Sequence, residues 1–318
     1  MTTVAPRPGD YPVALFGAIH MDTIAHANVT ILRETSTPAR FETRPGGVAA
    51  NVARALARLG STPALVGAVG RDSNGEALLM RLAAEGVSIA AVIRSPLPTG
   101  RYIALHDPDG GLAAAAVDAA ITDRLEADAF LPLHPATRNA SCWFIEANLP
   151  PPLLESLLDT AGSRRVIADA VSRAKAERLK PFLRRIGLLF CNRAEASVLT
   201  GLNEASPVAE LGEGLLGLGV GACCVMDGAE PIAYGDRSGI RLYRPLAANL
   251  VDVTGAGDAL IAAFIAASLQ GKSADACLRS GLAAAAITLE SPGSVPDSLS
   301  AAAITARLAR SEEPSVSA

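Results

Sequence analysis

One short segment near the C-terminal end of the chain combines the residue types that anion chemistry requires. Residues 251–258 read Val-Asp-Val-Thr-Gly-Ala-Gly-Asp, and the apolar run 259–269 after them predicts a helix. A helix start presents unpaired backbone N–H groups and a positive dipole end, and glycines let an anion approach them closely. Asp258 would lie beside that anion as a base. An anion site with an adjacent base is what phosphoryl transfer to an alcohol needs.

Two commoner glycine motifs do not fit the sequence. Residues 255–257 begin like a dinucleotide-binding fingerprint, but Leu260 stands where its third glycine belongs. Residues 271–273 (Gly-Lys-Ser) resemble the end of a P-loop, but Ala266 replaces its first glycine, and the triplet follows a predicted helix rather than a strand. An ordinary loop-to-helix turn is the alternative interpretation of residues 254–258.

A second small-residue turn precedes another predicted helix. Residues 44–51 read Arg-Pro-Gly-Gly-Val-Ala-Ala-Asn. The adjacent Gly46 and Gly47 permit backbone angles closed to other residues, so they could form a hinge or a surface that a ligand approaches closely. Asn51, one turn into the helix, could bind a ligand or could lie on a solvated face.

Composition restricts the class of protein. The chain has 318 residues, half of them hydrophobic, and a net charge of −4, which gives no reason to expect a nucleic-acid partner. Its five cysteines match no zinc spacing, and their odd number argues against a complete disulfide framework. The N-terminal residues do not resemble a signal peptide, and no stretch predicts a membrane span. We therefore expect a cytoplasmic protein without a membrane partner.

The hydrophobic pattern predicts an α/β fold. Short apolar runs alternate with helical stretches, which indicates βαβ units and a doubly wound, mainly parallel sheet with helices on both faces. The predicted strands are 13–19, 63–69, 142–147, 166–168, 188–191 and 222–226. The predicted helices are 48–59, 75–84, 152–160, 173–183, 193–218, 259–270 and 273–289.

Two further segments alternate between apolar and polar residues and contain turn signals. Residues 23–43 and 99–117 predict antiparallel strands, which we expect to meet as a small β-sheet lid. The remaining boundaries follow from composition. We expect disordered tails at 1–10 and 311–318, and a single domain over 11–310.

Taken in order along the chain, these motifs carry a resemblance. Gly46-Gly47 before a helix, Asn192-Arg193-Ala194-Glu195 after a strand, and residues 252–258 together resemble the ribokinase-like (PfkB) family of sugar and nucleoside kinases. The resemblance extends over roughly residues 13–308. It implies a doubly wound α/β core with a small β lid, and an enzyme that uses ATP with Mg²⁺ to phosphorylate a hydroxyl group.

The resemblance assigns a role to each matching residue. Asp258 matches the catalytic base, and Gly255, Ala256 and Gly257 match the anion hole. On the substrate side, Asp22 matches the residue that holds sugar hydroxyls, and Gly46, Gly47 and Asn51 match the hinge. The assigned nucleotide-side residues are Asn192, Glu195, Gly228 and Thr254, with Glu195 helping to hold Mg²⁺ through water. Asp252 and Thr254, with the loop 291–294, match positions that help to build a site for a monovalent cation such as K⁺.

Within this family the sequence is most similar to the pseudouridine kinases. The similar segments are 41–51, 144–149 and 167–175. They imply phosphorylation of pseudouridine at its 5′ hydroxyl, with Lys175 contacting substrate or phosphate, or else lying on a solvated helix face. Lid residues that could meet the base are Thr43, Thr99 and Arg101.

Some positions depart from the family pattern. His20 stands where many members have asparagine, and Ala170 replaces a proline. Met226 and Pro231 flank Gly228, where members carry small polar residues, so nucleotide preference is open. The alternatives to a pseudouridine kinase are a ribokinase or another sugar or nucleoside kinase of the family, and a non-catalytic ligand sensor on a kinase fold. Because family members often cover their lid edges by pairing, we expect a homodimer through the lid.

Overall fold

A computed structural model describes residues 12–32, 34–109 and 111–312. Its main element is an eight-stranded sheet in the order β14-β13-β12-β11-β10-β9-β1-β4. The strands from β12 to β4 run parallel to one another, and the hairpin β13–β14 extends one edge in antiparallel fashion. This arrangement confirms the expected α/β class, because helices connect most of the parallel strands.

The elements have the following bounds. The strands are β1 Val13–Phe16, β2 His20–Ala27, β3 Ala39–Gly46, β4 Pro63–Val66, β5 Ala68–Gly70, β6 Ile93–Ser95, β7 Gly100–His106, β8 Leu112–Asp118, β9 Cys142–Glu146, β10 Arg165–Asp169, β11 Leu188–Asn192, β12 Cys223–Met226, β13 Ile232–Asp236 and β14 Gly239–Tyr243. The helices are α1 Val48–Arg58, α2 Ser73–Ala84, α3 Ala120–Asp123, α4 Pro135–Arg138, α5 Pro151–Ala161, α6 Arg173–Ala176, the 3₁₀ helix η1 Glu177–Arg185, α7 Arg193–Thr200, α8 Val208–Gly217, α9 Ala256–Leu269, α10 Ala274–Leu289 and α11 Ala301–Glu312.

Alternate residues of the central strands enter two separate cores. Leu15 and Phe144 join α1, α9 and α10 on one face, whereas Phe16 and Trp143 join α5, η1 and α8 on the other. This division follows from the period of two along a strand, and it requires strands that are apolar on both faces. The sheet is therefore a rigid layer between helices. The carboxyl ends of its strands are free to carry polar side chains.

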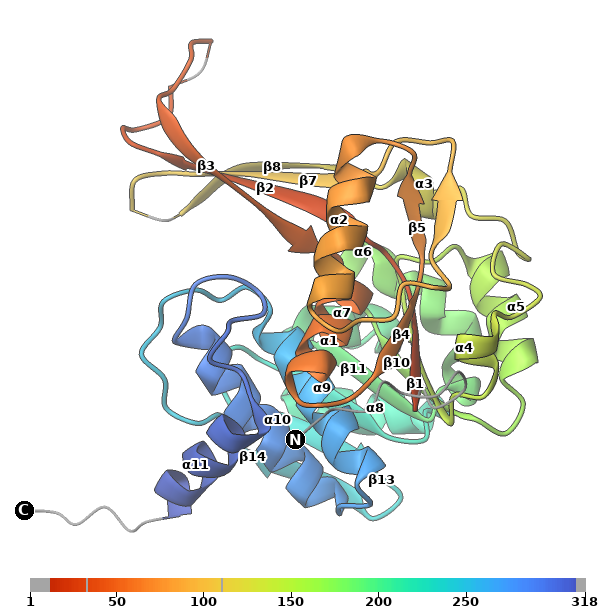
Figure 1. Cartoon of the computed structure of the whole chain (residues 1–318). Coiled ribbons are helices and arrows are strands. Elements are labelled where there is room, and N and C mark those ends of the chain that lie inside the picture. The colour runs from red at the N-terminus through yellow and green to blue at the C-terminus, as the bar shows by residue number, and fades with distance from the viewer. Residues whose placement is uncertain (1–11, 33, 110, 313–318) are drawn as a thin grey trace, which may run out of the picture.

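The lid is a four-stranded sheet in the order β3-β2-β7-β8. It consists of two antiparallel hairpins, as expected, but the inner strands β2 and β7 that join them run parallel. Figure 1 shows the lid extending away from the body of the molecule. Its near end, where His20 is in register with both Gly46 and Gly100, lies beside the core strands.

Several predicted elements need correction. The run 63–69 is two strands in different sheets, β4 and β5, separated at Gly67. The helix expected over 193–218 is interrupted between α7 and α8, because Gly201 ends α7 in the left-handed region with φ 76°. The helix expected over 173–183 is a short α6 followed by 3₁₀ turns that contain Pro181, a residue without the N–H that a helix interior needs.

The chain ends also differ from expectation. Helix α11 continues to Glu312, so the first two residues of the expected tail 311–318 are helical. The remainder of that segment and the expected tail 1–10 lie outside the described residues. None of the helices found in the described part of the chain combines the length and hydrophobicity needed to cross a bilayer.

Candidate active site

The predicted anion turn lies at the start of α9. Gly255 is the N-cap residue and has φ 79°, and a Cβ there would lie 2.2 Å from the carbonyl oxygen of Ser294. Glycine is therefore required at this position, both by backbone angle and by space. At Gly257 a Cβ would meet nothing closer than the Met226 side chain, 3.9 Å away. The first turn of α9 thus offers backbone N–H groups beside open space, which suits an anion.

Asp258 lies in this first turn, and its carboxylate is bound by α1. The Asn51 Nδ2 donates a hydrogen bond of 2.9 Å to Asp258 Oδ2. Burial raises the pKa of Asp258 to about 7, and the nearby Asp22 charge also raises it, whereas Asn51 and Arg54 lower it. The structure therefore brings together Asp258, Asn51 and the anion turn, which are about 200 residues apart in sequence. A carboxyl with a pKa near neutrality can act as a base at physiological pH.

The substrate-side residues meet at the near end of the lid. Asp22 of β2 is directly opposite Arg44 of β3, two residues before Gly46. Burial raises the pKa of Asp22 to about 6, although Arg44 and Arg54 lower it. Gly47 has φ 97°, and a Cβ there would lie 2.3 Å from the carbonyl oxygen of Ala18. The two glycines therefore let β3 pass closely into α1 beside Asp22, as a hinge-like connection requires.

Glu146 is a site residue that the sequence interpretation did not identify. It ends β9, is fully buried, and accepts hydrogen bonds from Asn148 Nδ2 at 3.1 Å and from Ala49 N at 3.1 Å, and also one from Ala18 N. Burial raises the pKa of Glu146 to about 7. Its carboxylate thus connects the β1–β2 link to the start of α1. A charged residue at the end of the apolar run Cys142–Glu146 was the available signal.

Residues expected on the nucleotide side gather at the ends of β10, β11 and β12. Asn192 and Glu195 form a reciprocal capping box at the start of α7, with Asn192 N donating to Glu195 Oε2 at 2.8 Å. Burial raises the pKa of Glu195. Burial also raises the pKa of Asp169, at the end of β10, well above its usual value, and the nearby Glu195 and Asp258 charges add to this effect. Two buried carboxyl groups, Asp169 and Glu195, therefore lie close enough for their charges to interact, and Asp169 also interacts with Asp258.

Met226 and Gly228 also lie on this side. Met226 is in register with Asn192 on the neighbouring strand, and its side chain approaches Gly257. Asp227 forms an ion pair with Arg193, which joins the turn after β12 to the start of α7. Gly228 follows in an exposed turn with φ 60°. The segment that departs from the family pattern therefore borders the anion turn.

The proposed cation segment has its own set of contacts. Asp252 Oδ1 accepts a hydrogen bond from Thr254 N at 2.8 Å, and Asp252 Oδ2 accepts one from Gly293 N at 2.9 Å. Arg44 Nη1 is 3.5 Å from Asp252 Oδ2. Backbone donors therefore fold the 291–294 loop over the anion turn, and a lid arginine pairs with the same carboxylate.

Other predicted contacts are placed differently. Lys175 Nζ is 2.8 Å from Asp123 Oδ1, and its charge lowers the pKa of the buried His20, which burial brings to about 4. The strand register places Thr43 and Arg101 on the face of the lid opposite Asp22. Thr99 donates to Asp72 Oδ1 at 2.6 Å. These three lid residues are therefore not available to a ligand beside Asp22, contrary to our expectation.

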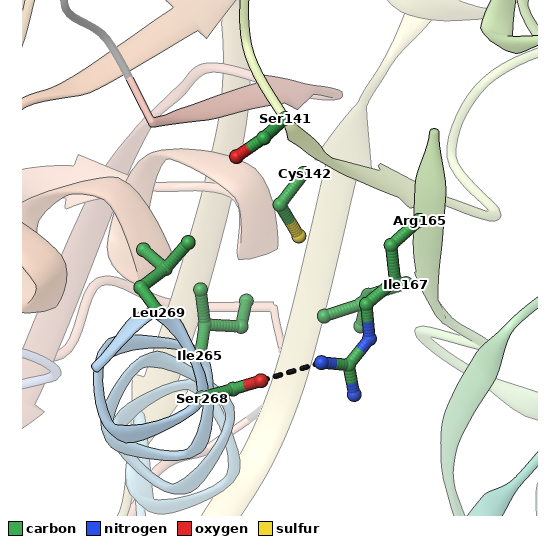
Figure 2. Close-up of a pocket in the computed structure, with 7 residues that line it drawn as sticks. All are labelled: Ser141, Cys142, Arg165, Ile167, Ile265, Ser268 and Leu269. Carbon is green, nitrogen blue, oxygen red and sulfur yellow. Dashed lines mark hydrogen bonds between the residues drawn. The ribbon is translucent and has the colours of Figure 1, made fainter. Parts of the chain in front are cut away.

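Two small pockets lie away from Asp258. One of about 110 Å³ lies between α9 and the first residues of β9 and β10, Cys142 and Arg165, at the opposite ends of these strands from Glu146 and Asp169 (Figure 2). The other, of about 170 Å³, is bordered by Arg44, Arg54 and the loop after α10. No group of three or more histidine, cysteine, aspartate or glutamate side chains that could hold a metal ion occurs in the part of the chain that the structure describes.

Comparisons with known proteins agree with this geometry. The model of the pfkB family carbohydrate kinases matches residues 12–301. Pseudouridine kinase of Escherichia coli is 29% identical over 269 residues, which are 83% of this chain and 86% of that protein. Ribokinase of Bacillus subtilis is 29% identical over 286 residues, 88% of this chain and 94% of that protein. The solved structure of a carbohydrate kinase from Agrobacterium tumefaciens has a TM-score of 0.81 and 29% identity, and covers 93% of this chain and 96% of that one.

Proposed function

Because the chain belongs to the pfkB family of carbohydrate kinases and is therefore a phosphotransferase that acts on hydroxyl groups, we propose that its acceptor is pseudouridine, phosphorylated at the 5′ hydroxyl with ATP as donor. The observation that carries the phosphoryl transfer in this proposal is the Asp258 carboxylate, bound by Asn51 in the first turn of α9. A base adjacent to an anion site is the arrangement that this reaction requires.

Each site residue is assigned one role in the phosphoryl transfer. Asp258 orients the acceptor hydroxyl and accepts its proton late, because phosphoryl transfer has a loose transition state. The N–H groups of Gly255, Ala256 and Gly257 stabilise the charge that develops on the transferred group. Asp22 binds hydroxyls of the sugar, and Gly46 and Gly47 let the lid approach the acceptor and exclude water.

The nucleotide side is compatible with ATP and Mg²⁺. Only the Met226 side chain, at 3.9 Å, would meet a Cβ at Gly257, which leaves room for a phosphate to approach the N–H groups of α9. Gly228 and Thr254 are proposed to bind the nucleotide. Glu195 would hold Mg²⁺ through water, with Asn192 orienting its carboxylate. When bound, the ion would neutralise phosphate charge. A site with few carboxylates fits this ion, since Mg²⁺ keeps several waters and takes other ligands from substrate phosphates.

Pseudouridine as the acceptor rests on similarity rather than on a contact. The E. coli pseudouridine kinase matches most of the chain, but at the same identity as the B. subtilis ribokinase. The segments 144–149 and 167–175, which resemble pseudouridine kinases, contain the buried carboxyl groups of Glu146 and Asp169. Lys175, ion-paired with Asp123, is the proposed contact to the substrate.

Two further features complete the proposal. A potassium ion beside Asp252 would share that carboxylate with Arg44, and activation by K⁺ over Na⁺ is the expected sign of it. The lid is proposed to pair with the lid of a second copy, because the edge strands β3 and β8 of its sheet have no strand partner on one side among the described residues.

An ADP-release assay tests the proposal. Pseudouridine, uridine, adenosine, cytidine, ribose and fructose are each supplied with ATP and Mg²⁺ in K⁺ and in Na⁺, with Asp258→Asn as control. We expect turnover of pseudouridine alone, and a loss of about 10²- to 10⁴-fold in the variant with binding retained. Turnover of another acceptor would keep the kinase and discard pseudouridine. Equal rates in the two salts would remove potassium.

A sensor predicts a different result from the same experiment. If the ligands raise the thermal midpoint of the protein but none is phosphorylated, the fold serves binding without catalysis. In that case Asp258→Asn would leave ligand binding unchanged and have no activity to reduce.

A further inference from the structure

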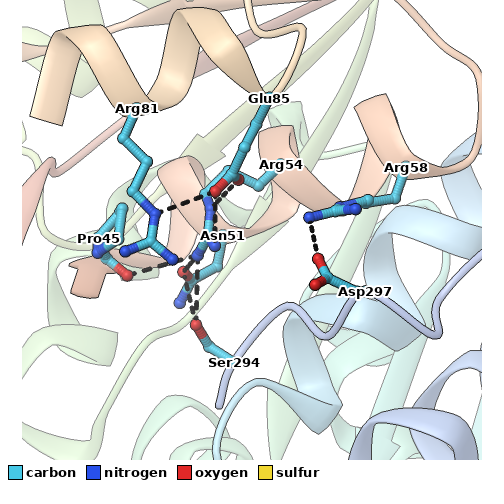
Figure 3. A network of polar contacts seen from close by, with 8 residues as sticks. All are labelled: Pro45, Asn51, Arg54, Arg58, Arg81, Glu85, Ser294 and Asp297. Atoms are coloured by element: carbon cyan, nitrogen blue, oxygen red, sulfur yellow. Dashed lines mark hydrogen bonds and ion pairs between the residues drawn. The ribbon is translucent and has the colours of Figure 1, made fainter. Parts of the chain in front are cut away.

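Arg54 occupies an unusual place on α1. Its side chain is only 4% exposed, yet it carries a charge into the wall of the active site. Figure 3 shows its guanidinium between the lid strand, α1, the end of α2 and the loop after α10. It forms an ion pair with Glu85 and donates hydrogen bonds to Pro45 O, Asn51 Oδ1 and Ser294 Oγ, at 3.5, 3.4 and 3.5 Å respectively.

These contacts form a directed chain that ends at Asp258. Arg54 donates to Ser294 Oγ, Ser294 donates to Asn51 Oδ1 at 3.1 Å, and Asn51 Nδ2 donates to Asp258 Oδ2 at 2.9 Å. A guanidinium has five N–H donors and no acceptor, so the chain can run in only one direction. Asn51 Oδ1 accepts hydrogen bonds from both Ser294 and Arg54, so the amide nitrogen must face the Asp258 carboxylate. Without these donors only the ionised carboxylate would favour this orientation, and a protonated Asp258 could donate to a flipped amide.

Stability alone does not account for a charge at this position. Removing two charges from water is costly, and a buried ion pair is often no better than an apolar pair of similar volume. The Arg54–Glu85 pair is also supported by Arg81, whose Nε is 3.2 Å from Glu85 Oε1. The guanidinium therefore has a stable anchor on one side, and its remaining N–H groups point at the partners of the catalytic carboxylate.

Since this rests on the proposed role of Asp258, we propose that Arg54 is a positioning residue for the phosphoryl transfer. It fixes the Asn51 amide so that Nδ2 holds Asp258 Oδ2, which leaves Oδ1 to accept the proton of the acceptor hydroxyl. It also ties this arrangement to Pro45 at the lid hinge and to Ser294, whose backbone lies against Gly255. The orientation of the base is thus coupled to the segments that surround the anion turn.

The charges around Asp258 are consistent with this role. Asp22 raises the pKa of Asp258, and Arg54 lowers it. Glu146 and Asp169 also face this carboxylate, since Asp258 raises the pKa of each of them. Arg54 thus opposes the effects of burial and of the Asp22 charge on the pKa of Asp258, and its loss should favour the protonated, inactive form of the base.

Four variants test the proposal by steady-state kinetics on whichever acceptor the wild type phosphorylates. In Arg54→Met/Glu85→Gln both members of the ion pair become neutral, so no buried charge is left unpaired. Arg54→Lys keeps a positive charge and N–H donors at this position. Ser294→Ala removes the hydroxyl that links Arg54 to Asn51. Arg58→Met is the matched control: Arg58 lies one turn further along α1 and pairs with the exposed Asp297 instead (Figure 3).

We expect the double variant to lose about 10- to 100-fold in kcat, because misplacement of a reacting group by about 1 Å has this effect. The KM of the acceptor should change little, and the acid limb of the pH–kcat profile should move to higher pH. Arg54→Lys should recover part of kcat, Ser294→Ala should lose several-fold, and Arg58→Met should match the wild type. A folded double variant with wild-type kcat and pH profile would overturn the proposal.

Two further measurements keep the outcome decisive. If the double variant does not fold, wild-type kinetics in both Arg54→Lys and Ser294→Ala would overturn the proposal instead. If the wild type phosphorylates no acceptor, the proposed function fails. The orientation of the Asn51 amide toward Asp258 is then measured by NMR. The Asn51 side-chain amide signal, assigned by its absence in Asn51→Ser, should shift with the titration of Asp258. Retention of that shift in the Arg54 variants would refute a role for Arg54.

Discussion

At the scale of residues, the site is defined by carboxyl groups whose protonation is shifted toward neutral pH. Burial raises the pKa of Asp258 and Glu146 to about 7 and that of Asp22 to about 6. Of these three residues, only Asp258 lies at the anion turn. Asn51 donates to its Oδ2, so that Oδ1 can accept a proton. Glu146 is held by two backbone N–H groups and an amide, which favour a fixed structural role. The same residue type therefore performs different work according to its partners.

The pH dependence of kcat/KM follows from the raised pKa of Asp258. The base must be ionised, so activity should be full above the folded-state pKa and fall about tenfold per pH unit below about 7. Asn51 lowers that pKa, so Asn51→Ala should move the acid limb to higher pH. Asp22 raises it, so Asp22→Asn should move the limb to lower pH while weakening acceptor binding. A limb that remains near pH 4 in the wild type would contradict this assignment.

At the scale of elements, two glycines of one turn have different tasks. Gly255 adopts φ 79° against the backbone of Ser294, whereas Gly257 lies in the first turn of α9 with open space in front of it. The first is needed to form the turn. The second is needed only if something must approach the turn closely, which makes the pair a test of the anion site.

Alanine substitutions should separate these two tasks. Gly255→Ala should lower the free energy of unfolding by about 1–3 kcal/mol, since it combines a strained backbone with a clash. Gly257→Ala should leave the unfolding free energy unchanged or raise it slightly, because alanine is favoured in helices. Its ATP affinity should nevertheless fall, since the added methyl occupies the approach to the N–H groups. Urea unfolding and calorimetric ATP titration measure the two quantities, and normal ATP binding by Gly257→Ala would remove the close-approach role.

At the scale of the whole molecule, one face of the lid carries Asp22 and the other carries exposed apolar side chains. His20, Asp22 and Arg44 share one face of the lid. On the opposite face lie Phe41 and Ile103, which are 67% and 43% exposed. Exposed apolar side chains beside unpaired strand edges favour association with another sheet.

We therefore expect a homodimer at micromolar concentration, measured by light scattering. Phe41→Glu with Ile103→Glu should convert it to a monomer, because charges would be buried between the lids. Leu242→Glu is the control: Leu242 is 59% exposed on β14, at the far edge of the central sheet, and its substitution should leave the dimer intact. A monomeric wild type would remove lid pairing from the proposal.

The sequence by itself determined the class of fold and the chemical character of the turn at 251–258. Apolar runs that alternate with helical stretches specify a parallel sheet, and local glycines with a following apolar run specify a helix start. The expected family and its kinase activity followed from the order of these motifs, and the family match over residues 12–301 confirms them. Local sequence signals of this kind can be interpreted without knowing which distant residues are in contact.

Tertiary structure alone decided which side chains meet. Asp258 accepts a hydrogen bond from Asn51, 207 residues away in sequence, and Glu146 accepts one from Ala49, 97 residues away. Periodicity cannot predict such pairs, because they depend on which strand ends lie together. Strand register likewise put Thr43 and Arg101 on the wrong face for the base contacts we expected, since a shift of one residue reverses every side chain. Arg54 was overlooked for the same reason: only the folded chain brings Glu85 and Ser294 to an arginine that, in sequence, is one polar residue in an alanine-rich helix.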